Sequence, residues 1–177
     1  SIEGIRLMNT LFLITARGGS RGVPKKNIRK IGGLPLLAYK AIAAHKSNYC
    51  TRLIISTDSD EIAAVAREYG VEVPFMRPAE LATANSMDVI LHAMDWIEKN
   101  DTVKYDTLCL LEPSTPFLTP EDVNQAIQLY QEKNALGVLG VKEVKDHSIF
   151  VSPIGDDLNM AQHYEKMRGN YHTPRQV

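Results

Sequence analysis

Apolar and polar positions follow two rhythms along the chain. Some apolar runs are short, of strand length, and end in polar or glycine-rich sequence. Between them, apolar residues recur at three- and four-residue spacing, which is typical of amphipathic helices. The predicted strands are residues 11–15, 52–56, 105–111 and 136–141, and the predicted helices begin near Pro35, Asp58, Ser86 and Thr119. Strands alternating with helices predict an α/β fold with a doubly wound, mostly parallel sheet and helices on both faces.

Several element ends carry their own signals. Asp58 and Glu61 have the spacing of a capping box, and Gly70 is placed to close that helix. Ser86 is expected to cap the third helix. The run at 105–111 alternates less than a surface strand would, so we expect a central strand covered on both faces.

The sequence after the first predicted strand concentrates groups that bind anions. Within residues 16–27 stand three glycines, Gly18, Gly19 and Gly22, and four cations, Arg17, Arg21, Lys25 and Lys26. Glycines let consecutive backbone N–H groups point at one anion, and the cations share its charge. Neither a Walker loop nor a dinucleotide fingerprint is present, because Gly-Lys-Ser/Thr and Gly-x-Gly-x-x-Gly do not occur here. We therefore predict a phosphate-binding loop of another type, at the carboxyl end of a strand, where parallel sheets bind ligands.

This stretch, Ala-Arg-Gly-Gly-Ser-Arg-Gly-Val-Pro-Lys-Lys-Asn, resembles the N-terminal signature of the CMP-sialic acid synthetases, also called acylneuraminate cytidylyltransferases. The family motif falls on Ala16, Arg17, Ser20, Arg21, Gly22, Lys26 and Asn27. Arg21 stands where the family usually has lysine, which keeps the charge and changes its geometry. The resemblance runs to about Val144. It implies a Rossmann-like nucleotidyltransferase fold, here expected to lack its C-terminal part.

The expected site residues follow from the loop and the resemblance together. Arg17 and Lys26 are the catalytic candidates, acting on the triphosphate. The nucleotide-binding candidates are Ala16, Gly18, Gly19, Ser20, Arg21, Asn27, Arg77 and Ser86. The last two come from the resemblance alone, since residues 77–82 are similar to a family segment whose arginine, with a following serine, contacts cytosine. Glu112 and Asp58 are candidates for a metal ion or a sugar hydroxyl, with a turn and a helix cap as their structural alternatives.

The resemblance implies a cytidylyltransferase that activates a sialic-acid-type 2-keto sugar acid with CTP, using Mg²⁺, as a homodimer. N-acetylneuraminate, legionaminate, pseudaminate, KDN and the shorter KDO are all possible acceptors. The alternative from another class is a non-catalytic nucleotide-binding or regulatory domain. Glu112 favours it, because the family usually has glutamine there.

Composition limits the binding partners and the cellular compartment that we expect for this protein. The net charge of −1 gives no general basic face for nucleic acid, so the positive charge is local to the loop. Cys50 and Cys109 match no metal or redox spacing, and no membrane-spanning or signal-peptide pattern occurs, so we expect the reducing cytoplasm. The 177 residues suit a single nucleotidyltransferase domain at 8–177, with residues 1–7 an upstream extension or an expression remnant.

Overall fold

A computed structural model describes residues 8–20, 22–81 and 84–141. All the elements below lie in a first compact unit that ends at Val138, while residues 139–141 belong to a second unit. The expected extension at 1–7 lies outside the described residues, and the single domain at 8–177 stays a prediction.

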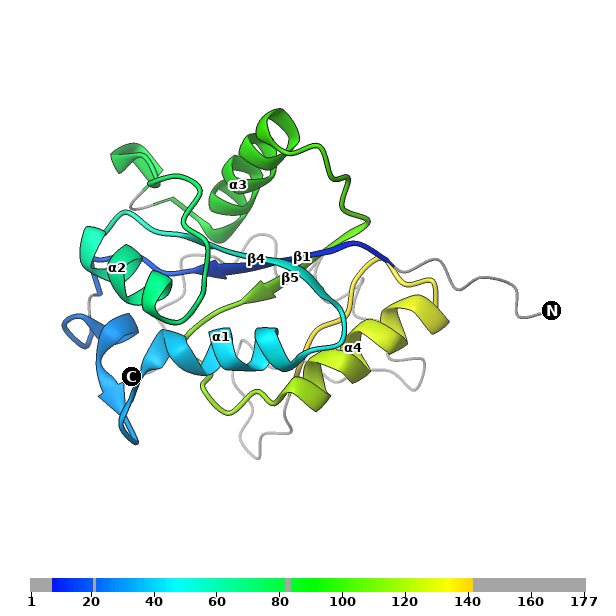
Figure 1. The fold of residues 1–177 in the computed structure, drawn as a ribbon, viewed down its shortest axis with the longest axis horizontal. Coiled ribbons are helices and arrows are strands. Elements are labelled where there is room, and N and C mark those ends of the chain that lie inside the picture. Colours follow the sequence, from blue (N-terminus) through cyan, green and yellow to red (C-terminus); the bar gives the residue numbers. More distant parts are fainter. Residues whose placement is uncertain (1–7, 21, 82–83, 142–177) are drawn as a thin grey trace, which may run out of the picture. The chain divides into compact units, whose positions relative to one another are not determined.

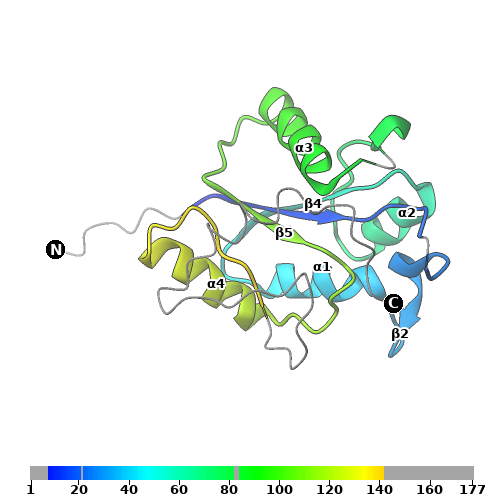
Figure 2. The same cartoon turned by 180° about the vertical axis from the view of Figure 1, so that it is seen from behind.

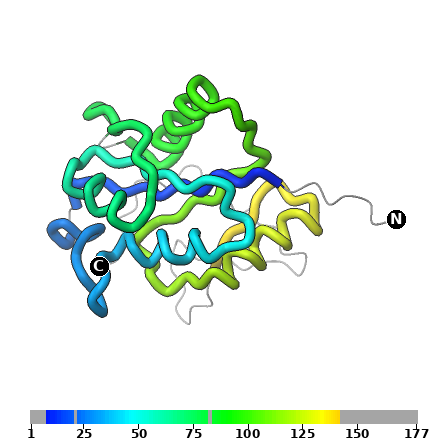
Figure 3. Tube along the Cα trace, viewed as in Figure 1, coloured from blue at the N-terminus to red at the C-terminus, as the bar shows by residue number. Residues whose placement is uncertain are grey.

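Three parallel strands form the main sheet of the described chain. They are β1 (Thr10–Thr15), β4 (Cys50–Ser56) and β5 (Thr107–Leu111). Their order is β4-β1-β5, so the first strand in sequence lies in the middle. Figure 3 shows this order, with blue β1 between cyan β4 and green β5. The carboxyl ends of all three strands therefore meet at one edge of the sheet.

Helices cover both faces of this sheet, as the sequence predicts. They are α1 (Leu36–Lys46), α2 (Asp60–Glu68), α3 (Ser86–Asn100) and α4 (Pro120–Glu132). In the views from front and back, α1 and α4 lie on one side of the strands and α3 on the other (Figures 1 and 2). The prediction of a doubly wound α/β fold is confirmed.

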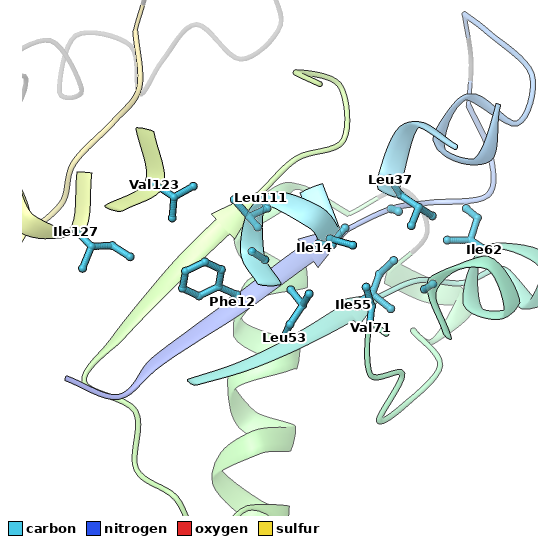
Figure 4. Close-up of a cluster of buried hydrophobic side chains, with 14 residues drawn as sticks. Phe12, Ile14, Leu37, Leu53, Ile55, Ile62, Val71, Leu111, Val123 and Ile127 are labelled. Carbon is cyan, nitrogen blue, oxygen red and sulfur yellow. The ribbon is translucent and has the colours of Figure 1, made fainter. Parts of the chain in front are cut away.

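The core follows the two-residue period of the strands. Phe12 and Ile14 of β1 point toward α1 and α4, where Val123 and Ile127 pack beside them (Figure 4). Leu11 and Leu13 of the same strand point the other way. The cluster on that second face is completed by Ile54 of β4 and by Ala93 and Ile97 of α3. Alternate residues of the buried strand β1 thus pack against helices on opposite faces of the sheet.

A small hairpin connects the glycine-rich loop to α1. It is formed by β2 (Lys30–Ile31) and β3 (Leu34–Pro35), which pair antiparallel. The turn consists of Gly32 and Gly33, with φ values of +58° and +89°. Two consecutive positive φ angles are what a tight two-residue hairpin requires, and glycine supplies them without strain. Apart from Pro35, where the first helix was expected to begin, the apolar pattern assigned no element to the residues of this hairpin.

Four predicted element features are wrong. β5 is an edge strand of the described sheet rather than a central one, and Leu110 is 37% exposed. Residues 136–141 form no strand, and Leu136 among them is fully exposed. The cap of α2 is Ser59, whose side chain accepts a hydrogen bond from the N–H of Ile62. The cap of α3 is Asn85 rather than the expected serine.

Candidate functional site

The glycine-rich loop leaves the carboxyl end of the central strand. The N–H of Ala16 still donates to the carbonyl of Ser56, at 3.1 Å, so the loop begins as a continuation of the β1–β4 pairing. The N–H of Ser20 then donates to the carbonyl of Gly18 at 3.0 Å, which closes a tight turn around the exposed Gly19. The expected position of the loop, at the ligand-binding edge of a parallel sheet, is confirmed.

Asp58 holds this loop against the end of the neighbouring strand. Its Oδ1 accepts a hydrogen bond of 2.7 Å from the N–H of Gly18, 40 residues away in sequence. A Cβ on Gly18 would lie 3.0 Å from the Cβ of Ser59, so only glycine allows this approach without displacement. Since Ser59 caps α2, the helix-cap explanation for Asp58 is wrong. The carboxylate orients the loop instead.

The second half of the loop is held by Asn27. This side chain is 6% exposed, and its Nδ2 donates to the carbonyl of Arg17 at 3.0 Å. It lies in the short 3₁₀ helix η1 (Lys26–Ile28), which also carries the half-buried Lys26. The amide nitrogen of Asn27 therefore shapes the loop, and its contact with a nucleotide stays a prediction.

Lys25 is drawn away from the centre of the loop. Its backbone is left-handed, with φ +51°, and its Nζ forms an ion pair of 2.7 Å with Oε1 of Glu61 on α2. Both side chains are well exposed, so the pair adds little stability. Among the described cations of the loop, Arg17 and Lys26 form no such ion pair, and their contact with a ligand stays a prediction. Arg21 lies outside the described residues.

Arg77 reaches the same edge of the sheet from the opposite side of β4. Its guanidinium is buried, with Nε 3.1 Å from the hydroxyl of Ser56 and Nη2 2.6 Å from the carbonyl of that residue. Burial lowers the pKa of Arg77, the Asp58 carboxylate raises it, and the positive charge of Arg17 lowers it further. Arg77 therefore has a structural role at the end of β4, which the resemblance did not imply. Two of its N–H groups build the strand end, and its contact with cytosine stays a prediction.

Ser86, the other residue expected to contact cytosine, is exposed in the first turn of α3. Asn85 caps that helix by accepting from the N–H of Asp88 at 3.0 Å, so the cap does not account for Ser86. No described contact brings Ser86 to Arg77, and its role stays a prediction.

The turn at residues 112–116 follows β5 at the same edge. Glu112 is exposed, and its carbonyl accepts from the hydroxyl of Thr115 at 3.3 Å. That hydroxyl in turn accepts a 3.1 Å hydrogen bond from Nζ of Lys40 on α1. Sequence reasoning missed Lys40. The sequence did contain a sign of it, because Lys40 follows Leu37 by three residues and so falls on the apolar face of the predicted helix, next to Ala41.

The described residues contain no cluster of three or more side chains suited to a metal ion. Asp58 and Glu112 follow different strands on opposite sides of β1. They do not make a metal centre by themselves. Among the described helices, none combines the length and the apolar character needed to cross a membrane.

The family model described as cytidylyltransferase matches residues 11–168. The chain belongs to the cytidylyltransferase family. The match begins in the central strand of the sheet and includes the glycine-rich loop, Arg77 and the 112–116 turn. The family suggested by the loop motif is thereby confirmed.

Relatives in the cytidylyltransferase family include two proteins named CMP-N,N'-diacetyllegionaminic acid synthase. The chain is 40% identical over 126 residues to the one from Legionella pneumophila, covering 70% of this chain and 54% of that protein. It is 45% identical over 108 residues to the one from Campylobacter jejuni, covering 60% and 46%. The chain thus spans about half the length of these curated relatives.

The fold of this cytidylyltransferase chain also matches a solved structure. The structure is that of CMP:2-keto-3-deoxy-manno-octonic acid synthetase complexed with CTP, with a TM-score of 0.61. The match covers 72% of this chain and 49% of the other at 22% sequence identity. It supports the Rossmann-like nucleotidyltransferase fold.

Proposed function

We propose that this protein transfers CMP from CTP to a sialic-acid-type 2-keto sugar acid. One observation carries the proposal. The glycine-rich loop, which contains Arg17, lies at the carboxyl end of the central strand. It is fixed by the hydrogen bond from the N–H of Gly18 to the Asp58 carboxylate. Arg77 binds the end of the neighbouring strand β4 and interacts electrostatically with Arg17 and Asp58. Membership of the cytidylyltransferase family supports nucleotidyl transfer from CTP as the reaction of such a loop.

In this proposal, the loop binds the triphosphate and β4 binds the base. Arg17 and Lys26 neutralise the phosphate oxygens, and the N–H of Gly19 and the hydroxyl of Ser20 donate to them. Arg77 contacts the cytosine through N–H groups that its two bonds to Ser56 do not use. An anion also relieves the repulsion between Arg17 and Arg77, which share the region of Asp58.

The reaction joins the anomeric oxygen of the acceptor to the α-phosphorus of CTP. The bond from that phosphorus to the β-phosphate oxygen breaks, pyrophosphate leaves with the electron pair, and the hydroxyl proton is released. The cationic groups of the loop stabilise charge that develops on the leaving group. Mg²⁺ would supply further charge neutralisation on the phosphates. The described carboxylates do not form its site, so we derive no step through it.

We propose a nine-carbon acid of the legionaminate type as acceptor. Its support is the name shared by the two relatives at 40% and 45% identity. N-acetylneuraminate, pseudaminate, KDN and KDO remain the competing acids. We further propose that the enzyme works in the cytoplasm and that it is a homodimer. Sedimentation with and without CTP tests the dimer directly.

The test is pyrophosphate release by the full-length protein with Mg²⁺, CTP and each of these acids. ATP, GTP and UTP serve as nucleotide controls. We expect release with CTP and one acid, and an increase of at least tenfold in KM for CTP in Arg17→Met and Lys26→Met. Lys30→Met is the matched control, because Lys30 is an exposed lysine of the hairpin that follows the loop. Equal effects of all three substitutions would show that general charge, rather than the loop, binds the nucleotide.

A non-catalytic nucleotide-binding domain is the second candidate. The observation that favours it is the absence of a carboxylate cluster among the described residues. CTP binding by calorimetry without pyrophosphate release for any acid would favour this reading. Failure to bind CTP would overturn both.

A further inference from the structure

A buried lysine stands at the interface between α1 and the end of β5. Lys40 is 1% exposed, although its side chain carries a charge. It lies on the inward face of α1 together with Leu37, Ala41 and Ala44, all of which belong to the core. Lysine is rarely buried to this extent unless it is paired.

The partner of Lys40 is a neutral hydroxyl. Its Nζ donates to Oγ1 of Thr115 at 3.1 Å, and that hydroxyl donates to the carbonyl of Glu112 at 3.3 Å. Within the described residues no carboxylate lies at ion-pair distance from Lys40. Burial lowers the pKa of Lys40, and Coulomb interactions with Cys109 and then Glu112 partly oppose this shift. An ammonium in such surroundings costs stability, so its retention calls for a reason other than folding.

The position of the contact between Lys40 and Thr115 suggests why this buried lysine is retained. Thr115 belongs to the 112–116 turn at the carboxyl end of β5, while Asp58 and Arg77 belong to the β4 side of the central strand. If the base lies over β4 and the phosphates over the loop after β1, the second substrate approaches over β5. The exposed Glu112 then faces the acceptor.

We propose that Lys40 is a positioning residue, which fixes the 112–116 turn as a wall of the acceptor site. This inference rests on the proposed function. Through Thr115 the ammonium orders the turn that presents the Glu112 carboxylate to acceptor hydroxyls. Its positive charge also offsets the repulsion between Glu112 and an acceptor that is itself an acid.

Four variants of the full-length protein test the proposal. Lys40→Met removes the charge and keeps the length of the side chain, and Thr115→Val removes the hydroxyl with little change of shape. Thr115→Ser keeps the hydroxyl. Lys46→Met is the matched control, because Lys46 is an exposed lysine at the end of the same helix.

We expect Lys40→Met to raise KM for the sugar acid about tenfold, to change KM for CTP less than twofold, and to leave the melting temperature equal or higher. Thr115→Val acts in the same direction, Thr115→Ser restores most of the loss, and Lys46→Met has no effect. In hydrogen exchange, residues 112–118 exchange faster in Lys40→Met, while the middle of α1 keeps its protection.

Two results would overturn the inference. One is an unchanged KM for the acid with unchanged exchange in the turn. The other is a lowered melting temperature with KM for both substrates raised together, which indicates a purely structural lysine. If the unsubstituted protein releases no pyrophosphate with any acid, the proposed function itself is wrong and the acceptor role is lost with it. Hydrogen exchange still decides whether Lys40 orders the turn.

Discussion

Replacing Asp58 with alanine tests how the glycine-rich loop is held and whether its geometry serves CTP binding. The carboxylate accepts the N–H of Gly18 at 2.7 Å, the short distance of a charge-assisted hydrogen bond. Such bonds contribute about 1.5–3 kcal/mol. At about 1.4 kcal/mol for each factor of ten, loss of the anchor weakens CTP binding about 10- to 100-fold.

The sign of this effect separates loop anchoring from simple electrostatics. Asp58 is a negative charge beside the proposed triphosphate site, and its field reaches Arg77. Removing that charge strengthens CTP binding if Coulomb attraction alone matters. Weaker binding in Asp58→Ala therefore requires that the carboxylate organise the loop.

Calorimetric titration with CTP, with and without Mg²⁺, is the assay. Asp58→Asn keeps an acceptor oxygen without its charge and is expected to fall between alanine and the unsubstituted protein. Asp60→Asn is the control, because Asp60 is exposed at the start of α2. Tighter or unchanged CTP binding in Asp58→Ala refutes the reasoning. A loss seen only when Mg²⁺ is present shows that Asp58 is a metal ligand instead.

Three further predictions use other parts of the same region. Gly18→Ala is expected to lower the free energy of unfolding by about 1–3 kcal/mol, because the new Cβ would lie 3.0 Å from the Cβ of Ser59. Gly19→Ala is expected to change the free energy of unfolding by less than about 0.5 kcal/mol, because a Cβ there meets nothing within 4 Å. Equal urea midpoints for the two variants would contradict this. Arg77→Lys is expected to lower the free energy of unfolding by about 2 kcal/mol or more, because lysine cannot make both hydrogen bonds to the end of β4. An unchanged urea midpoint in this variant would argue against the prediction. Burial raises the pKa of Cys109 to about 11 from 9.0. Because the folded pKa is the higher one, the stability from the buried thiol is present below pH 9 and is lost between about pH 9 and 11, so Cys109→Ala should flatten the fall of the melting temperature over that interval.

Local pattern was enough for the elements and for the position of the loop. The apolar run after residue 10 predicts β1, and the spacing of Val123 and Ile127 predicts the inward face of α4, since both depend on neighbours along the chain. The glycines and cations of residues 16–27 indicated an anion site before any contact was known. The resemblance in that stretch led to the family that the comparison confirms.

Local pattern failed where several nearby residues suit the same role. Asp58 and Ser59 both favour a helix start, as do Asn85 and Ser86. Which one caps the helix depends on the path of the chain into it, and this path is set by packing. Likewise, the apolar run ending in Leu111 reads as a buried strand whether it is central or at an edge, because strand order depends on pairing between distant segments.

The contacts that hold the site together depend on tertiary packing. The decisive contacts join residues far apart in sequence, 40 residues from Gly18 to Asp58, 21 from Ser56 to Arg77 and 75 from Lys40 to Thr115. No local preference specifies such pairs, because each forms only after the sheet brings the strand ends together and burial removes water as the competing partner. Local sequence was therefore enough to predict a glycine-rich loop at the end of β1, whereas the packing of the sheet and helices specifies which side chains hold it.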